Sequence, residues 1–264
     1  MALTRDVLRI AAIGDLHCTK ALPPGGLAPL FAQAAESADV LLLCGDLTDY
    51  GLPEEARALV RELATAKVRV LAVLGNHDYE SEKSDEVRQI LTDGTVTVLD
   101  GDSVEIEGVG FAGVKGFAGG FGERGLQAWG EPMIKRFVRE AVDEALKLET
   151  ALARLRTPQR IAVLHYSPVV STVDNEPPEI FAFLGSSRLE DPINRYSVTA
   201  VFHGHAHRGR PEGRTTAGIP VYNVALPLLR RAYPDRPPFR LLEVPVASTA
   251  LIEPVATEAY ARRD

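Results

Sequence analysis

The segment VLRIAAIGDLH, residues 7–17, begins as a run of apolar residues and ends in Gly14, Asp15 and His17. Two further segments repeat this pattern, VLLLCGDLTD at residues 40–49 and VRVLAVLGNHD at residues 68–78. Short apolar runs that end at glycine are typical of buried parallel strands. Open α/β sheets bind their ligands at the carboxyl ends of such strands. The pattern therefore predicts a sheet with polar side chains gathered along one edge.

The rest of the chain alternates in the same way. Helix-like stretches at 27–37 and 53–66 separate the three strands, and 96–114 predicts short strands broken by turns. A long amphipathic helix is expected at 132–156, strands at 161–164 and 198–202, and further strands in the tail at 215–252. With no repeat and no low-complexity linker, the sequence predicts one α/β domain, residues 1–264, with two packed mixed β-sheets.

Composition narrows the possible partners. The chain has 264 residues, a net charge of -7, and two cysteines, Cys18 and Cys44, which argues against a disulfide scaffold or a zinc site built on thiolates. The acidic balance disfavours long nucleic acids as the main partner. No apolar run reaches the roughly 18 residues that a membrane span needs, so no membrane partner and a cytoplasmic location are expected. An anionic substrate would then need a local positive site, which metal ions can supply.

Histidines gather at the predicted strand ends. Of the six histidines, five stand beside carboxylates or glycines: His17, His77, His165, His205 and His207. Residues two apart in an extended chain face the same way, so Asp15 can join His17, and His205 can join His207. Imidazole and carboxylate without thiolate suit Mn, Fe, Zn, Ni or Co. These groups are too many for one tetrahedral zinc and fit two metals that share a bridging carboxylate.

Five motifs in this order resemble the calcineurin-like metallophosphoesterases. They are D-x-H at 15–17, G-D-x-x-D at 45–49, G-N-H-D at 75–78, the histidine at 165, and G-H-x-H at 204–207. The resemblance spans most of the chain and implies the family fold, a four-layer α-β-β-α sandwich in which helices flank two sheets. It also implies hydrolysis of a phosphoester by a metal-activated hydroxide.

The resemblance assigns a role to each matching residue. It implies two divalent ions (Mn, Fe or Zn, with Mn favoured), held at a first site by Asp15, His17 and His207 and at a second site by Asn76, His165 and His205, with Asp46 as the bridge. His77 would contact the phosphate and protonate the leaving group. Asp78 or Asp49 would orient His77, and the alternative for Asp78 is a cap for the helix that begins near Ser81. His203 matches no motif and is expected to be structural.

The substrate is less closely defined. Phosphoprotein phosphatases of this superfamily carry an arginine directly after G-D-x-x-D, whereas this chain has Tyr50. The motif style is closest to bacterial class III cyclic-nucleotide phosphodiesterases, although His165-Tyr-Ser-Pro168 departs from their His-His-Pro-Pro. A small phosphoester is therefore the expected partner, with phosphodiesters and cyclic nucleotides favoured.

Two other activities of the same fold stay open. One is a phosphomonoesterase, and the other is a nucleotide or lipid pyrophosphatase with an apolar cap from residues 116–129 or 177–184. A non-enzymatic scaffold is disfavoured, because the motifs have lost no ligand. The oligomeric state cannot be inferred from the sequence.

Overall fold

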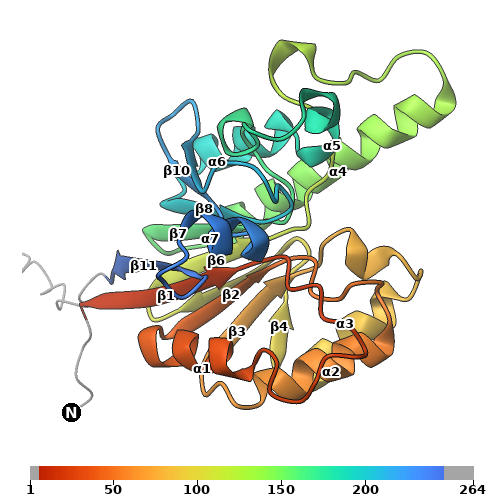
Figure 1. Ribbon diagram of the computed structural model, residues 1–264. Helices are drawn as coiled ribbons and strands as arrows, with labels where there is room; N and C mark the ends of the chain where they lie inside the picture. Colours follow the sequence, from red (N-terminus) through yellow and green to blue (C-terminus); the bar gives the residue numbers. More distant parts are fainter. Residues whose placement is uncertain (1–5, 247–264) are drawn as a thin grey trace, which may run out of the picture.

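The computed structural model describes residues 6–246, whose strands form two sheets (Figure 1). The first sheet has five strands in the order β11 (Arg240–Pro245), β1 (Val7–Ile13), β2 (Val40–Cys44), β3 (Arg69–Val73) and β4 (Val96–Val98). The second sheet has six, in the order β5 (Asp102–Ile106), β6 (Val109–Gly113), β7 (Gln159–Val163), β8 (Ala200–His203), β10 (Pro220–Asn223) and β9 (Glu212–Arg214). Both sheets are mixed, because β11, β5 and β9 run antiparallel to their neighbours while the central strands are parallel.

Helices cover the outer faces of the two sheets. The α-helices are α1 (Ala28–Ser37), α2 (Pro53–Leu63), α3 (Ser84–Asp93), α4 (Pro132–Arg154), α5 (Phe181–Leu184), α6 (Glu190–Arg195) and α7 (Leu226–Ala232). Helices α1, α2 and α3 pack on the first sheet, and α4 and α6 pack on the second, with the N-terminal part of α4 extending beyond the sheet (Figure 1). Among the described residues, no helix is both long enough and apolar enough to cross a membrane.

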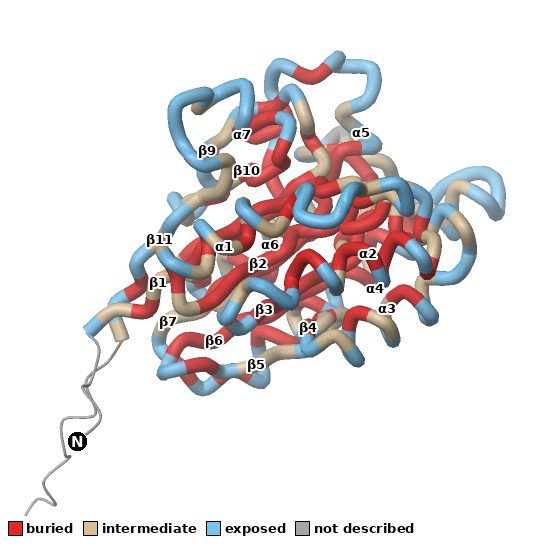
Figure 2. Tube along the Cα trace, turned by 60° about the horizontal axis from the view of Figure 1, so that its bottom comes forward, coloured by how far each residue is buried: buried red, intermediate tan, exposed pale blue. Residues whose placement is uncertain are grey.

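Strand β2 shows why the fold has four layers. All five of its side chains are buried. Successive residues of a strand point to opposite faces. Leu41 and Leu43 accordingly join the core under the helices of the first sheet, whereas Val40, Leu42 and Cys44 join the core between the two sheets. Figure 2 shows these buried strands at the centre of the molecule, with the exposed segments around them.

Strand register brings the motif-bearing ends together. Ile13 lies opposite Leu43, and Cys44 lies opposite Val73, so β1, β2 and β3 end at nearly the same level. In the second sheet, Val163 at the end of β7 lies opposite Phe202 near the end of β8. The loops that follow these five strands therefore leave the two sheets on the same side of the molecule.

The predicted α/β sandwich with two mixed sheets and flanking helices is confirmed, and most element boundaries agree within a few residues. The tail is the main difference, because residues 226–232 form α7 where only strands were predicted. Pro227 stands in the first turn of α7, where a proline suits a helix, although Leu226, Leu228 and Leu229 look like part of an apolar strand. The last part of the predicted tail, residues 247–252, lies outside the described residues.

Candidate metal centre

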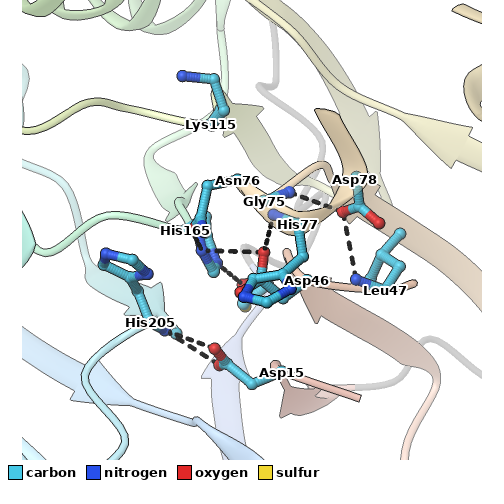
Figure 3. Close-up of polar contacts among 12 residues, drawn as sticks. Asp15, Asp46, Leu47, Gly75, Asn76, His77, Asp78, Lys115, His165 and His205 are labelled. Carbon is cyan, nitrogen blue, oxygen red and sulfur yellow. Dashed lines mark hydrogen bonds and ion pairs between the residues drawn. The ribbon is translucent and has the colours of Figure 1, made fainter. Parts of the chain in front are cut away.

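The seven side chains that the sequence predicted as metal ligands lie together at the carboxyl ends of five strands. They follow the strands in chain order: Asp15 and His17 after β1, Asp46 after β2, Asn76 after β3, His165 after β7, and His205 and His207 after β8. Figure 3 shows that residues from both sheets point toward one another at this place. Two of the side-chain groups have the spacing of a metal site, Asp15–His17–His207 and Asp46–His165–His205, with ligand atoms within 4.8 Å of one another in each.

The backbone of these loops is strained where it presents the ligands. Asp15, His17, Asp46 and His205 all have positive φ, at 56°, 44°, 47° and 71°. Residues other than glycine seldom adopt this conformation, which costs of order 1–3 kcal/mol each and is concentrated at functional sites. The surrounding fold therefore holds these four residues in a geometry that local preference alone would not select.

Two motif glycines make room for the carboxylates. A Cβ atom added at Gly75 would collide with the backbone nitrogen and the carboxylate of Asp46, and one added at Gly204 would collide with the carboxylate of Asp15. The backbone of each loop passes so close to a ligand that only glycine fits. The glycines of G-N-H-D and G-H-x-H are thus part of the construction of the site.

In the first group, Asp15–His17–His207, one buried ligand atom lacks a hydrogen-bond partner. His17 Nδ1 lies 3.2 Å from Asp49 Oδ1, which orients the ring, while its buried Nε2 has no hydrogen-bond partner. His207 Nε2 lies 3.0 Å from Asp15 Oδ1. A ligand histidine usually bonds through its other ring nitrogen to a carboxylate or carbonyl, as His17 does here. The orphaned Nε2 of His17 fits a cation at this position.

The second group, Asp46–His165–His205, gathers hydrogen-bond acceptors. His165 Nδ1 donates to the Cys44 carbonyl oxygen at 3.0 Å, which leaves a lone pair on Nε2 of the neutral ring. That Nε2 lies 2.9 Å from Asn76 Oδ1 and 3.3 Å from Asp46 Oδ1. A ligand histidine binds a metal through an unprotonated nitrogen, and in that form all three of these atoms are acceptors that suit a cation. His205 Nε2 donates to the Phe183 carbonyl oxygen at 3.1 Å and so leaves Nδ1 as its ligand atom.

Asp46 faces both groups. Its Oδ1 lies 3.3 Å from His165 Nε2 in the second group, and its Oδ2 lies 3.8 Å from His17 Nε2 in the first. Oδ1 also accepts a hydrogen bond from the backbone N–H of His77. This placement fits the bridging role that the sequence assigned to Asp46.

The electrostatics of the two groups differ. Burial alone would raise the pKa of Asp15, but the hydrogen bond from His207 and the nearby His165 lower that pKa overall. The same hydrogen bond raises the pKa of His207. Burial lowers the pKa of His205 to about 4, and the neighbouring His165 adds to this effect. At neutral pH His205 is therefore ready to bind a metal, whereas a metal at His207 competes with a proton that the ring holds more tightly than usual.

Of the two residues expected to orient His77, Asp49 contacts its ring and Asp78 does not. His77 Nδ1 donates to the backbone carbonyl of Asp49 at 2.7 Å, and its ring lies 4.5 Å from that of His17. Asp78 is fully buried and makes no hydrogen bond to the His77 ring; its carboxylate accepts from the N–H groups of Leu47, Thr48 and Gly75 and from the Thr48 hydroxyl. The orientation of His77 therefore comes from the Asp49 carbonyl, and Asp78 instead ties the loops after β2 and β3 together (Figure 3).

Several supporting groups could not be read from motifs. The carbonyl groups of Cys44 and Phe183 orient two ligand histidines, but any residue supplies a carbonyl, so the sequence carries no signal for them. His203 is buried, and its ring bonds to the Thr172 hydroxyl and the Gly204 carbonyl, in line with a structural role. Lys115, on the Asn76 side of the centre in Figure 3, donates to the Gly116 carbonyl.

Comparison with known proteins identifies the class. The family described as calcineurin-like phosphoesterase matches residues 8–209. The fold is similar to that of phosphopantetheinyl hydrolase from Mycobacterium tuberculosis, with a TM-score of 0.64 and 17% identity over 90% of this chain and 96% of that one. It is also similar to TT1561 of Thermus thermophilus, with a TM-score of 0.51 and 17% identity over 91% of this chain and 99% of that one. No curated protein matches the chain.

The family match covers well over half of the chain. The protein therefore belongs to the calcineurin-like phosphoesterases, and it is a metal-dependent phosphoester hydrolase. The family implies a centre of two divalent metal ions, and the two groups described above provide the histidine and carboxylate ligands for it.

Proposed function

We propose that this hydrolase acts on small phosphodiesters, including cyclic nucleotides, in preference to phosphomonoesters. Divalent ions held by the two groups would lower the pKa of a water molecule and neutralise charge on the phosphate oxygens. Because histidine and carboxylate ligands without thiolate suit manganese, we propose Mn²⁺ as the native ion.

The observation that carries this proposal is the residue after the second aspartate of G-D-x-x-D. Tyr50 stands there with a side chain that is 59% exposed, and a phenol, unlike a guanidinium group, supplies no positive charge to the phosphate. Two divalent ions, the carboxylates of Asp15 and Asp46 and a hydroxide leave a local charge of about +1. That charge suits the monoanion of a diester better than the dianion of a monoester, which gains more from an added guanidinium group.

His77 is the residue that we assign to the leaving group. Its Nδ1–H is held by the Asp49 carbonyl, which fixes the ring and leaves Nε2 to hold or release a proton. The ring lies beside that of His17 in the first group, with the two ring centroids 4.5 Å apart. From this position Nε2 would donate its proton to the leaving oxygen as the ester bond breaks.

The test compares kcat/KM for bis-p-nitrophenyl phosphate and p-nitrophenyl phosphate with the same metal at the same pH. The leaving group is identical, so the ratio reports on the rest of the substrate. A higher value for the diester is expected, and a clear preference for the monoester would overturn the diester proposal while leaving the metal-dependent hydrolase in place. Metal reconstitution with Mn²⁺, Fe²⁺ and Zn²⁺ in parallel tests the choice of ion.

A second candidate is a pyrophosphatase with a partly apolar substrate. The segment that the sequence suggested as an apolar cap does reach the centre, since the Phe183 carbonyl bonds to His205 while the Phe183 side chain is 58% exposed. An exposed aromatic ring beside a ligand histidine is a suitable contact for an acyl chain. Activity on a nucleotide-linked lipid, greater than on bis-p-nitrophenyl phosphate and lost in Phe183→Ser, would favour this candidate.

A further inference from the structure

An open cavity of about 480 Å³ is lined by residues of α7 and of the loop that follows the ligand His207. Arg208 and Arg231 line it, together with the amide of Asn175 and the apolar side chains of Pro211 and Leu228. Arg208 directly follows the ligand His207 in the chain, and Arg231 Nη2 donates to the His207 carbonyl oxygen at 2.9 Å. The cavity is thus built onto the same loop that carries a metal ligand, and its size is that of a small-ligand pocket.

The charge of this cavity is unbalanced. None of the described residues that line it is acidic, and within residues 6–246 no carboxylate forms an ion pair with the guanidinium group of Arg208 or Arg231. The neighbouring Arg210 differs, because it pairs with Asp174. The buried carboxylate of Glu176 accepts a hydrogen bond from the backbone N–H of Arg208 rather than from its guanidinium group. Two guanidinium groups without carboxylate partners, in a chain with a net charge of -7, mark a local site for an anion.

The chemistry of the lining indicates which anion. Guanidinium groups bind phosphate through paired N–H donors, and the Asn175 amide adds a further donor or acceptor. Half-buried Pro211 offers an apolar surface to a short organic spacer, and Leu228 lies buried beneath the cavity wall. We propose that this cavity binds a second phosphate group of the substrate, carried on a small organic group whose other phosphate lies at the metal centre. The inference rests on the proposed function, because it places the scissile phosphate between the two metal groups.

The two arginines place positive charge in the cavity, apart from the metal centre where the scissile phosphate would bind. Tyr50 leaves the metal centre with a charge suited to a monoanion, and Arg208 and Arg231 would bind a separate anionic group. The proposed substrate class is therefore a phosphodiester that bears one further phosphate.

The experiment measures binding without turnover. Calorimetry on the metal-loaded protein compares butanediol bisphosphate and hexanediol bisphosphate with butyl phosphate and hexyl phosphate, which lack the second phosphate. At least one bisphosphate should bind about 10- to 100-fold more tightly than its monophosphate, which corresponds to charged hydrogen bonds to one phosphate. Arg208→Gln and Arg231→Gln should each lose most of this gain.

Arg230→Gln is the matched control. It removes the same charge from the adjacent position of α7, but Arg230 does not line the cavity, so the gain should persist. Equal binding of bisphosphates and monophosphates by the unmodified protein, or an equal loss in Arg208→Gln and Arg230→Gln, would overturn the inference. Metal content of each variant shows whether Arg231→Gln acts through His207. Hydrolysis of bis-p-nitrophenyl phosphate, which has no second phosphate, tests the proposed function separately.

Discussion

The two metal groups use the same kinds of side chain but differ in their exposure to solvent. In the first group, the side chains of His17 and His207 are 22% and 39% exposed, whereas in the second His165 is fully buried and only His205 is partly exposed. The first group also includes a histidine whose pKa is raised, and the second includes one whose pKa is lowered to about 4. The first group is therefore the more accessible to protons and solvent, and we expect its metal to exchange more readily than that of the second.

Replacing Asp46 should weaken metal binding at both groups and so remove the difference in metal exchange, since Asp46 faces both groups. We expect Asp46→Asn to stay folded, to lose most of both metals, and to lose activity by more than about 10³-fold, beyond the loss of a single oxyanion donor. Elemental analysis and kcat/KM measure the two effects. Asp85→Asn, which changes an exposed carboxylate on α3, is the control. Two bound metals and normal turnover in Asp46→Asn would rule out the bridging assignment.

Replacing His77 tests whether this residue is a proton donor or a further metal ligand of the first group. Its ring nitrogen lies within ligand distance of His17 and Asp49, so these three residues form a competing candidate group. If His77 is a proton donor, His77→Ala should keep both metals and lose rate by about 10²–10⁴-fold. The loss should be smaller for p-nitrophenyl esters than for alkyl esters, because p-nitrophenolate leaves without a proton. Loss of a metal would instead make His77 a ligand, and an equal loss of rate on both ester types would leave it an electrostatic role only.

Replacing the Asp49 side chain should change metal binding at the first group alone. Its carboxylate orients His17, while its backbone carbonyl, which a side-chain substitution preserves, orients His77. Asp49→Asn should weaken metal binding at the first group by about 10- to 100-fold and leave the second group unchanged. Competition with a chelator, followed by metal analysis, separates the two affinities. Equal weakening at both groups would show that the loop after β2 acts as one unit.

Of these four changes, a change of pH near neutrality should have the smallest effect on metal binding. A histidine binds metal only when neutral, so protons compete with the metal below its pKa. Because the pKa of His207 is raised, the first metal should begin to dissociate at higher pH than the second, where His205 stays neutral until about pH 4. Equilibrium dialysis between about pH 8 and pH 5 should show stepwise loss, at most about tenfold in affinity per pH unit for one competing proton. Loss of both metals in a single step would contradict the difference between the groups.

The spacing of the ligands was readable in the sequence because it follows the geometry of single strands. Asp15 and His17 leave one strand, and Asp46 leaves the next, so apolar runs and their terminal glycines were enough to predict a common edge. The direction in which each side chain points could not be predicted from the sequence. Asp78 follows His77 in the chain, yet its buried carboxylate turns to the loop after β2, where the N–H groups of Leu47 and Thr48 need an acceptor.

The amino-acid order by itself determined the alternation of strands and helices and the ligand types, because both depend on short-range pattern, and the chemical class followed from the resemblance of its motifs to a known family. Only the tertiary structure decided which oxygen of Asp46 faces which group, which carbonyls hold His77, His165 and His205, and that Arg208 and Arg231 share one cavity. These contacts join residues far apart in the chain; His205 N, for example, bonds to the Asp15 carboxylate across 190 positions. Contacts of this kind between the sheets form only when the two sheets pack face to face, so they follow from burial of the shared core.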